Sequence, residues 1–117
     1  MTLVKRGDVW LINLDPAIGH EIKKARPGVV IQNDVGNKYS QITIVAPLTS
    51  QNTDKAYPFE AIITKKTPGL PKDSKALLNQ IRAIDKSRMI KKLANLGKQE
   101  MEQVDEAIKI SLGLKKI

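Results

Sequence analysis

The 117-residue chain contains no cysteine and no long apolar run. The absence of cysteine excludes disulfides and thiolate metal sites, and it is compatible with a reducing cytoplasm. No stretch approaches the roughly 18 consecutive apolar residues that a membrane helix needs. The basic pair Lys5-Arg6 is not followed by the apolar core of a signal peptide. We therefore expect a cytoplasmic protein with no membrane partner.

Aromatic residues and histidine are also scarce. The aromatic residues are Trp10, Tyr39, Tyr57 and Phe59, whereas proteins that bind single strands on stacking platforms use several surface aromatics. This scarcity disfavours a module that works by stacking alone. His20 is the only histidine. Because histidine is the usual side chain for proton transfer at neutral pH, its single occurrence excludes a two-histidine mechanism.

Acidic residues are few relative to basic ones. The chain has 20 Lys and Arg against 12 Asp and Glu, so its net charge is +8. This balance favours a polyanionic partner, such as nucleic acid, an acidic protein segment or an anionic membrane. Many small proteins are basic without such a partner, so charge alone does not decide. At this length, with 41% hydrophobic residues, residues 1–117 are expected to form a single globular domain.

The chain does contain a series of short apolar, β-branched runs bounded by turn residues, which is typical of strands. Strands are predicted at residues 7–14, 26–32, 42–47, 59–64 and 76–81. Residues 33–38 have the composition of a turn. The segment 85–97 is ambiguous, since residues 89–93 fit either a short strand or a helical turn.

Residues 98–112 predict the one clear helix. Met101, Val104, Ile108 and Leu112 recur at three- and four-residue spacing and form one apolar stripe. Gly113 follows as a C-terminal cap. Five or six short strands closed by this helix predict an α+β, mainly β fold, with a small, strongly bent antiparallel sheet or barrel.

A polar, cationic loop is expected between the first two strands, at residues 15–26. It is longer than a hairpin needs, and long loops are usually functional or disordered. It ends in Arg26-Pro27, and a proline biases the preceding residue towards an extended conformation. We therefore expect the Arg26 guanidinium at the start of a rigid strand, against a second strand end, Pro47-Leu48-Thr49-Ser50.

Seven short motifs along the chain stand in the order found in one family of toxins. They are Arg6-Gly7-Asp8-Val9-Trp10, Asp15-Pro16, Gly19-His20-Glu21, Arg26-Pro27, Ala46-Pro47-Leu48-Thr49-Ser50, Leu78-Asn79-Gln80-Ile81-Arg82-Ala83-Ile84-Asp85 and Val104-Asp105-Glu106-Ala107. Each motif is short, but their order and spacing are specific together and cover nearly the whole chain. The chain resembles the MazF/PemK toxins, and most of all the MazF endoribonucleases, or mRNA interferases, of type II toxin–antitoxin pairs.

The resemblance implies a compact SH3-like barrel, which these toxins share with the gyrase poison CcdB, and a homodimer. It implies sequence-specific cleavage of single-stranded mRNA without a metal or another cofactor. The 2′-hydroxyl would attack the phosphorus and leave a 2′,3′-cyclic phosphate and a 5′-hydroxyl. It also implies an antitoxin with an acidic, disordered C-terminal segment, which agrees with the net charge of +8. The RNA sequence that is cut differs among members and does not carry over.

Three residues match positions with catalytic roles in the family. Arg26 matches the catalytic arginine. Because arginine stays protonated at neutral pH, we assign Arg26 to stabilising the phosphorane and to protonating the leaving oxygen, and not to base catalysis. Thr49 matches the catalytic threonine and can donate to a phosphate oxygen. Glu21 aligns with a loop acid implicated in some relatives and is a candidate proton acceptor. Taken alone, each residue also fits an ordinary loop or strand-end position.

A second group of polar residues is expected to bind RNA. Asn79 departs from relatives that carry Asp or Glu there, and an amide cannot accept a proton as those acids would, so the general base stays open. Asn79 and Gln80 can instead hydrogen-bond the edge of a base. The full group is Ser50, His20, Lys23, Lys24, Asn79, Gln80 and Arg82.

Two other functions remain open from the sequence. One is a non-enzymatic toxin on the same fold that binds and poisons gyrase, as CcdB does. Such a toxin needs no pairing of Arg26 with Thr49 and would contact its target through the C-terminal helix. The other is a small basic RNA-binding module without chemistry, which the scarcity of aromatic residues disfavours.

Overall fold

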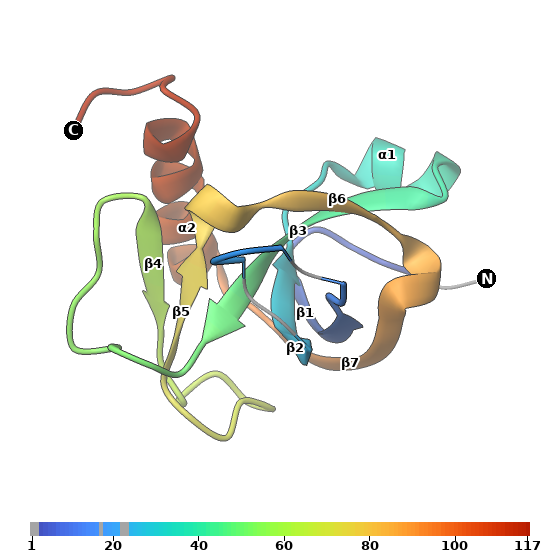
Figure 1. Cartoon of the computed structure of the whole chain (residues 1–117), viewed down its shortest axis with the longest axis horizontal. Helices are drawn as coiled ribbons and strands as arrows, with labels where there is room; N and C mark the ends of the chain where they lie inside the picture. Colours follow the sequence, from blue (N-terminus) through green and yellow to red (C-terminus); the bar gives the residue numbers. More distant parts are fainter. Residues whose placement is uncertain (1–2, 17, 22–23) are drawn as a thin grey trace.

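The computed structural model of the protein describes residues 3–16, 18–21 and 24–117. A strongly bent antiparallel sheet dominates it, and one long helix lies against an end of the sheet (Figure 1). No helix in these ranges is long and apolar enough to cross a membrane. In chain order the elements are β1 (Asp8–Asn13), β2 (Ala25–Val30), α1 (Asp34–Tyr39), β3 (Ile42–Thr49), β4 (Glu60–Ile63), β5 (Ser74–Leu77), the 3-10 helix η1 (Leu78–Gln80), β6 (Arg82–Asp85), the 3-10 helix η2 (Lys86–Arg88), β7 (Met89–Asn95) and α2 (Lys98–Ser111).

Strand β3 is the centre of the sheet. The described strands follow the order β4-β5-β3-β2-β1-β7, and β6 also pairs with β3. Along one edge, β3 pairs with β2 in a register that runs from Gly28 opposite Pro47 to Val30 opposite Val45. Along its other edge, its first half pairs with β6 and its last two residues pair with β5. Because one strand serves two successive ladders on that edge, the sheet bends around β3.

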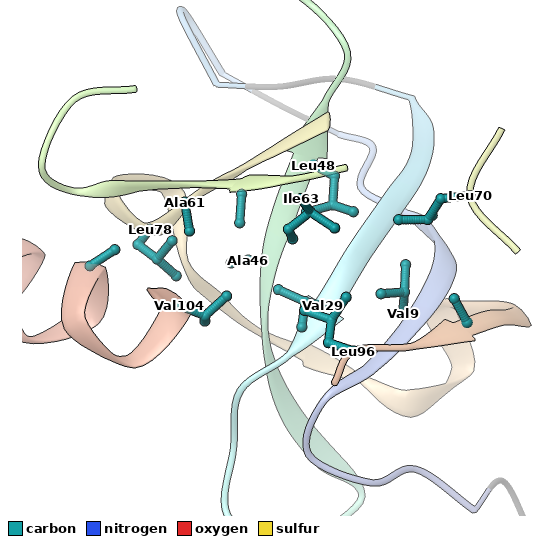
Figure 2. Packing of buried hydrophobic residues seen from close by; sticks show 13 residues of the cluster. Val9, Val29, Ala46, Leu48, Ala61, Ile63, Leu70, Leu78, Leu96 and Val104 are labelled. Atoms are coloured by element: carbon teal, nitrogen blue, oxygen red, sulfur yellow. The ribbon is translucent and has the colours of Figure 1, made fainter. Parts of the chain in front are cut away.

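The second half of strand β2 is buried on both faces, as its β-branched residues predict. Val29 belongs to a core between the sheet and α2 (Figure 2), whereas Val30 belongs to a second core on the opposite face. Ala46 and Val45 of β3 divide between the same two cores, because successive strand residues point to opposite faces. All four residues are fully buried. The β2–β3 pair is therefore held from both sides.

The apolar stripe predicted for α2 is confirmed along most of its length. Val104 is fully buried, and Met101 and Ile108 pack against the same core. Ala107, which the stripe omits, is also buried, whereas Leu112 is 55% exposed. Leu112 lies just beyond the last helical residue, so the helical period no longer directs its side chain towards the core.

Gly113 ends α2 as expected. Its φ is +76°, and its N–H donates to the Ile110 carbonyl while the N–H of Leu114 donates to the Lys109 carbonyl. These two bonds form the left-handed cap that glycine favours at a helix C-terminus.

Two predictions of local structure are wrong. Residues 33–38, predicted as a turn, contain the start of α1, because Asn33 caps the helix by accepting the N–H of Gly36 at 2.8 Å. Residues 76–81, predicted as one strand, divide between β5 and η1. Leu78 is fully buried in the core against α2, and Ser111 Oγ donates to its carbonyl at 2.7 Å, so the chain leaves the ladder there. The ambiguous segment 85–97 contains η2 and the strand β7.

The loop between β4 and β5 contacts β7 at Gly69. This contact connects β4 and β7, the two ends of the strand order. Gly69 has a φ of +97°, and a Cβ placed there would lie 2.0 Å from the Leu93 carbonyl oxygen and 3.2 Å from the Ala94 side chain. Glycine alone satisfies both the backbone conformation and the available space. Gly113 has a comparable φ, but a Cβ there would have nothing within 4 Å.

Gly69→Ala is expected to lower the free energy of unfolding by about 3 kcal/mol, because it adds a steric clash to the cost of a left-handed alanine. Gly113→Ala is the matched control and should cost about 1 kcal/mol, since it carries the backbone cost alone. Chemical denaturation measures both. Equal losses would contradict the role assigned to the contact with Leu93.

Strands β4 and β5 share a buried ion pair. Lys75 Nζ lies 2.9 Å from Glu60 Oε1, and both side chains are 8% exposed. Lys75 Nζ also donates to the Lys55 carbonyl at 3.3 Å, and Glu60 Oε1 accepts the N–H of Tyr57 at 3.1 Å. Lys75 lies opposite Thr49 in the β3–β5 register. The ion pair therefore supports the strand end that carries a predicted catalytic residue.

Glu60→Gln is expected to lower the free energy of unfolding by about 3 kcal/mol, because it leaves the Lys75 ammonium buried without a counter-charge. Glu106→Gln removes a carboxylate from the exposed ion pairs of α2 and should leave the unfolding midpoint nearly unchanged. Urea unfolding of both variants tests this. A tolerant Glu60→Gln variant would show that the pair adds nothing to stability.

Candidate active site

The polar loop between β1 and β2 is closed at its base by two hydrogen bonds. The N–H of Leu14 donates to the Lys24 carbonyl at 3.2 Å, and the N–H of Lys24 donates to the Asp15 carboxylate at 2.8 Å. Lys24 has a φ of +68°, a left-handed conformation that turns the chain into β2. Arg26 is the second residue of that strand. The loop therefore enters β2 through a hydrogen-bonded neck immediately before Arg26.

A cleft of about 400 Å³ lies between this loop and the connection from β5 to β6. In Figure 1 the loop, in blue, extends across the sheet towards η1. The loop contributes Pro16, Ile18 and Glu21 to the lining, and the connection contributes Asn79, Gln80, Ile81 and Arg82. Four predicted site residues from distant parts of the sequence thus line one cleft: Glu21, Asn79, Gln80 and Arg82.

Glu21 is the only carboxylate among the described residues that line this cleft. Its Oε1 accepts the N–H of Ile18 at 2.6 Å, and its own N–H donates to the Ile18 carbonyl at 3.2 Å. The first bond fixes the Glu21 side chain relative to the loop backbone, and the second closes a turn between Ile18 and Glu21. A carboxylate has about four lone-pair positions, so Glu21 can still accept a proton from a group in the cleft.

Arg26 and Thr49 lie at neighbouring ends of β2 and β3. The pairing of these two strands ends at Gly28 opposite Pro47, and Arg26 and Thr49 each lie two residues beyond that pair in the same direction. There Arg26 pairs with Ile12 of β1, and Thr49 pairs with Lys75 of β5. Both are half-buried. Thr49 Oγ1 accepts the N–H of Gln51 at 3.2 Å, which uses a lone pair and not the hydroxyl proton. A guanidinium and a hydroxyl donor at neighbouring strand ends are suited to stabilise negative charge on phosphate oxygens.

The other predicted residues lie next to Thr49 in the sequence, on the loop or in the cleft. Ser50 is exposed immediately after Thr49, and His20 and Lys24 are exposed on the loop. Lys23 lies outside the described residues. Arg82 has a further contact, because its Nη1 donates to the Leu14 carbonyl at 2.8 Å. This arginine therefore links the cleft to the neck of the loop.

Several lining residues were not predicted from the sequence. Pro16, Ile18 and Ile81 give the cleft an apolar component. Ile18 is 81% exposed, and an isoleucine within a polar loop is the signal that could have identified it. A second hollow, of about 660 Å³, adjoins the end of β3 and includes Lys75 and Tyr57 in its lining. Tyr57 stacks on Phe59 with ring centroids 5.4 Å apart.

Metal-ligating side chains do not gather in the part of the chain that the structure describes, where no group of three or more His, Asp or Glu residues could hold an ion. The cleft supplies a carboxylate, a guanidinium group and two amides, and the ends of β2 and β3 supply a second guanidinium group and a hydroxyl. This combination provides one proton acceptor together with several donors to an anion.

Comparison with known proteins identifies relatives of the whole chain. The chain is 46% identical over 112 residues to the endoribonuclease EndoA of Bacillus subtilis (strain 168), and the match covers 96% of this chain and 97% of EndoA. The MazF crystal structure from Deinococcus radiodurans superposes with a TM-score of 0.82 at 25% identity, covering 97% of this chain and 99% of that one. A mycobacterial endoribonuclease in complex with its cognate antitoxin has the same fold, with a TM-score of 0.80 at 18% identity, covering 97% of this chain and 99% of that one.

The family match extends across every element that forms the cleft and across the strand ends that carry Arg26 and Thr49. Residues 5–112 match the family described as PemK-like, MazF-like toxin of type II toxin–antitoxin system. With nearly all of the sequence aligned and the fold shared, the chain belongs to the PemK-like, MazF-like toxins of type II toxin–antitoxin systems.

Proposed function

We propose that the protein is a metal-independent endoribonuclease toxin that cuts single-stranded mRNA at a short sequence. The observation that carries this proposal is that Arg26 and Thr49 lie at neighbouring ends of β2 and β3, each two residues beyond the Gly28–Pro47 pair. The cleft with Glu21 lies beside the same loop neck. Endoribonuclease activity is also the activity for which the 46% identical relative is named.

The proposed reaction is an attack by the ribose 2′-hydroxyl on the adjacent phosphorus. Glu21 takes the 2′-hydroxyl proton, the bond from the 2′ oxygen to phosphorus forms, and the bond from phosphorus to the 5′ oxygen breaks. Arg26 and Thr49 donate hydrogen bonds to the phosphorane oxygens, where negative charge develops. The 5′ oxygen leaves with a proton from Arg26, which is a downhill transfer because an alkoxide is more basic than a neutral guanidine. The products are a 2′,3′-cyclic phosphate and a 5′-hydroxyl, and solvent restores both side chains.

The general base that the sequence left open is assigned to Glu21 on the basis of the cleft. Asn79 lies in the same lining, but its amide cannot accept a proton. We assign Asn79 and Gln80 to the edges of RNA bases, where an amide both donates and accepts. The remaining proposed RNA contacts are His20, Lys23, Lys24, Ser50 and Arg82. Several phosphate contacts of this kind make RNA binding steeply dependent on salt.

The proposed partner is a cognate antitoxin with an acidic C-terminal segment. The net charge of +8 supports it, as do the solved structures of a mycobacterial endoribonuclease in complex with its cognate antitoxin and of MazE-MazF from Deinococcus radiodurans. We further propose that residues 1–117 act as one toxin domain, that two copies form a homodimer, and that the toxin works in the cytoplasm on mRNA. The alternative of a gyrase poison is not favoured, because the similar proteins are named endoribonucleases or MazF.

Cleavage of a long single-stranded RNA in excess EDTA tests the proposed function. The wild type should cut at one short sequence and leave 2′,3′-cyclic phosphates. Arg26→Ala should lower kcat about 10²–10³-fold, because it removes a donor to the charge that develops in the transition state. Lys91→Ala, at an exposed cation of β7, is the control and should retain activity. A requirement for added metal, or an active Arg26→Ala variant, would refute the mechanism.

Glu21→Gln tests the general base separately. The amide keeps the shape of the side chain but cannot accept the proton, so kcat should fall about 10²–10⁴-fold. Glu102→Gln removes an exposed carboxylate from α2 and should behave as the wild type. Single-turnover rates across pH measure both variants. An unchanged rate in Glu21→Gln would remove Glu21 from the reaction and leave the assignments of Arg26 and Thr49 intact.

A further inference from the structure

Two arginines donate hydrogen bonds to three consecutive carbonyl groups at the neck of the β1–β2 loop. Arg88 Nη1 donates to the Asn13 carbonyl at 3.1 Å and also to the Asp15 carbonyl. Arg82 Nη1 donates to the Leu14 carbonyl between them at 2.8 Å. The two side chains come from the end of η2 and the start of β6. They therefore tie residues more than sixty positions apart in the chain.

The segment that carries Arg88 is itself firmly held. The Asp85 carboxylate caps η2 by accepting the N–H of Ser87 at 2.8 Å, and this bond holds the pKa of Asp85 below its ordinary value. Lys86 is buried, and its N–H donates to the Gln41 carbonyl at 2.9 Å. Its Nζ donates to the Asn37 carbonyl. The Arg88 guanidinium thus extends from a fixed base.

The neck that the arginines hold leads directly to the proposed catalytic groups. Leu14, whose carbonyl binds Arg82, donates its N–H to the carbonyl of Lys24, two residues before Arg26. Asp15, whose carbonyl binds Arg88, accepts the N–H of the same Lys24. Glu21 lies on the loop that this neck closes. Displacement of the neck would move Glu21 relative to Arg26 and Thr49, which the paired strands β2 and β3 carry.

We infer that Arg88, together with Arg82, is a positioning residue that holds the loop neck so that Glu21 and Arg26 meet the same phosphate. The inference rests on the proposed function. Arg88 is not among the residues that line the cleft, and its Nη1 is directed at backbone carbonyls. It acts through the neck and not through RNA. A displacement of about 1 Å at such a site costs about 10²-fold in rate.

The test is Arg88→Met in the full chain, with Lys91→Met as the matched loss of one positive charge from an exposed residue of the adjoining strand. Arg88→Met should lower kcat by about 10²-fold and leave KM and its salt dependence at the wild-type values. Exchange of the Leu14 amide hydrogen should become faster, because the Leu14–Lys24 bond opens more often. Lys91→Met should change none of these. Arg88→Lys, which keeps a donor to the carbonyls, should recover part of kcat.

Each other outcome contradicts the inference in a distinct way. An unchanged kcat with an unchanged Leu14 amide would overturn it. A raised KM with a salt slope lowered by about one would identify Arg88 as a phosphate contact. If Arg88→Met unfolds, Arg88→Lys decides, and a kcat as low as that of Arg26→Ala with a native Leu14 amide would overturn it. The amide exchange needs no RNA, so it decides whether Arg88 holds the neck even if the wild type proves unable to cut RNA.

Discussion

The two-sided burial of the β2–β3 pair is the constraint on which the rest of the structure depends. Val29 and Val30 enter opposite cores, as do Ala46 and Val45. A slip of one residue in this register would place every side chain in the wrong core, so the pairing is strongly specified. That pairing brings the ends of β2 and β3 that carry Arg26 and Thr49 to the same side of the Gly28–Pro47 pair. The positions of the two proposed catalytic groups are therefore a consequence of core packing.

The site combines a rigid strand edge with loops that backbone bonds restrain. Thr49 belongs to β3, whose end is supported by the buried Lys75–Glu60 pair. Glu21 instead lies on a loop whose neck is held by hydrogen bonds from Arg82 and Arg88 to backbone carbonyls. In these hydrogen bonds the arginine side chains donate to backbone carbonyls at the base of the loop, so the rest of the loop can contact a ligand. Residues that take no part in the proposed reaction therefore position the few groups that do.

Patterns of burial were the most predictable feature. The unbroken apolar run of β2 indicated burial on both faces, and the period of α2 located Val104 on the core. Predictions failed where a tertiary contact overrode a local pattern. Leu78 looks like the middle of a strand, but its side chain fills the core against α2, and the chain leaves the ladder there. Asn33 has turn chemistry, and the same capping bond that favours a turn starts α1 instead.

The sequence by itself determined the family, through seven ordered motifs, as well as the basic charge and the placement of Arg26 at the junction of loop and strand. It also named the polar side chains of the cleft, because their chemistry is visible in residue types, but not the apolar ones. Only the tertiary structure decided that Glu21 shares a cleft with Asn79, and that Arg82 and Arg88 hold the neck of the loop. The physical reason is that these arrangements depend on packing between distant segments and on backbone carbonyls. Because every residue has a backbone carbonyl, the sequence does not show which carbonyls accept hydrogen bonds from an arginine side chain.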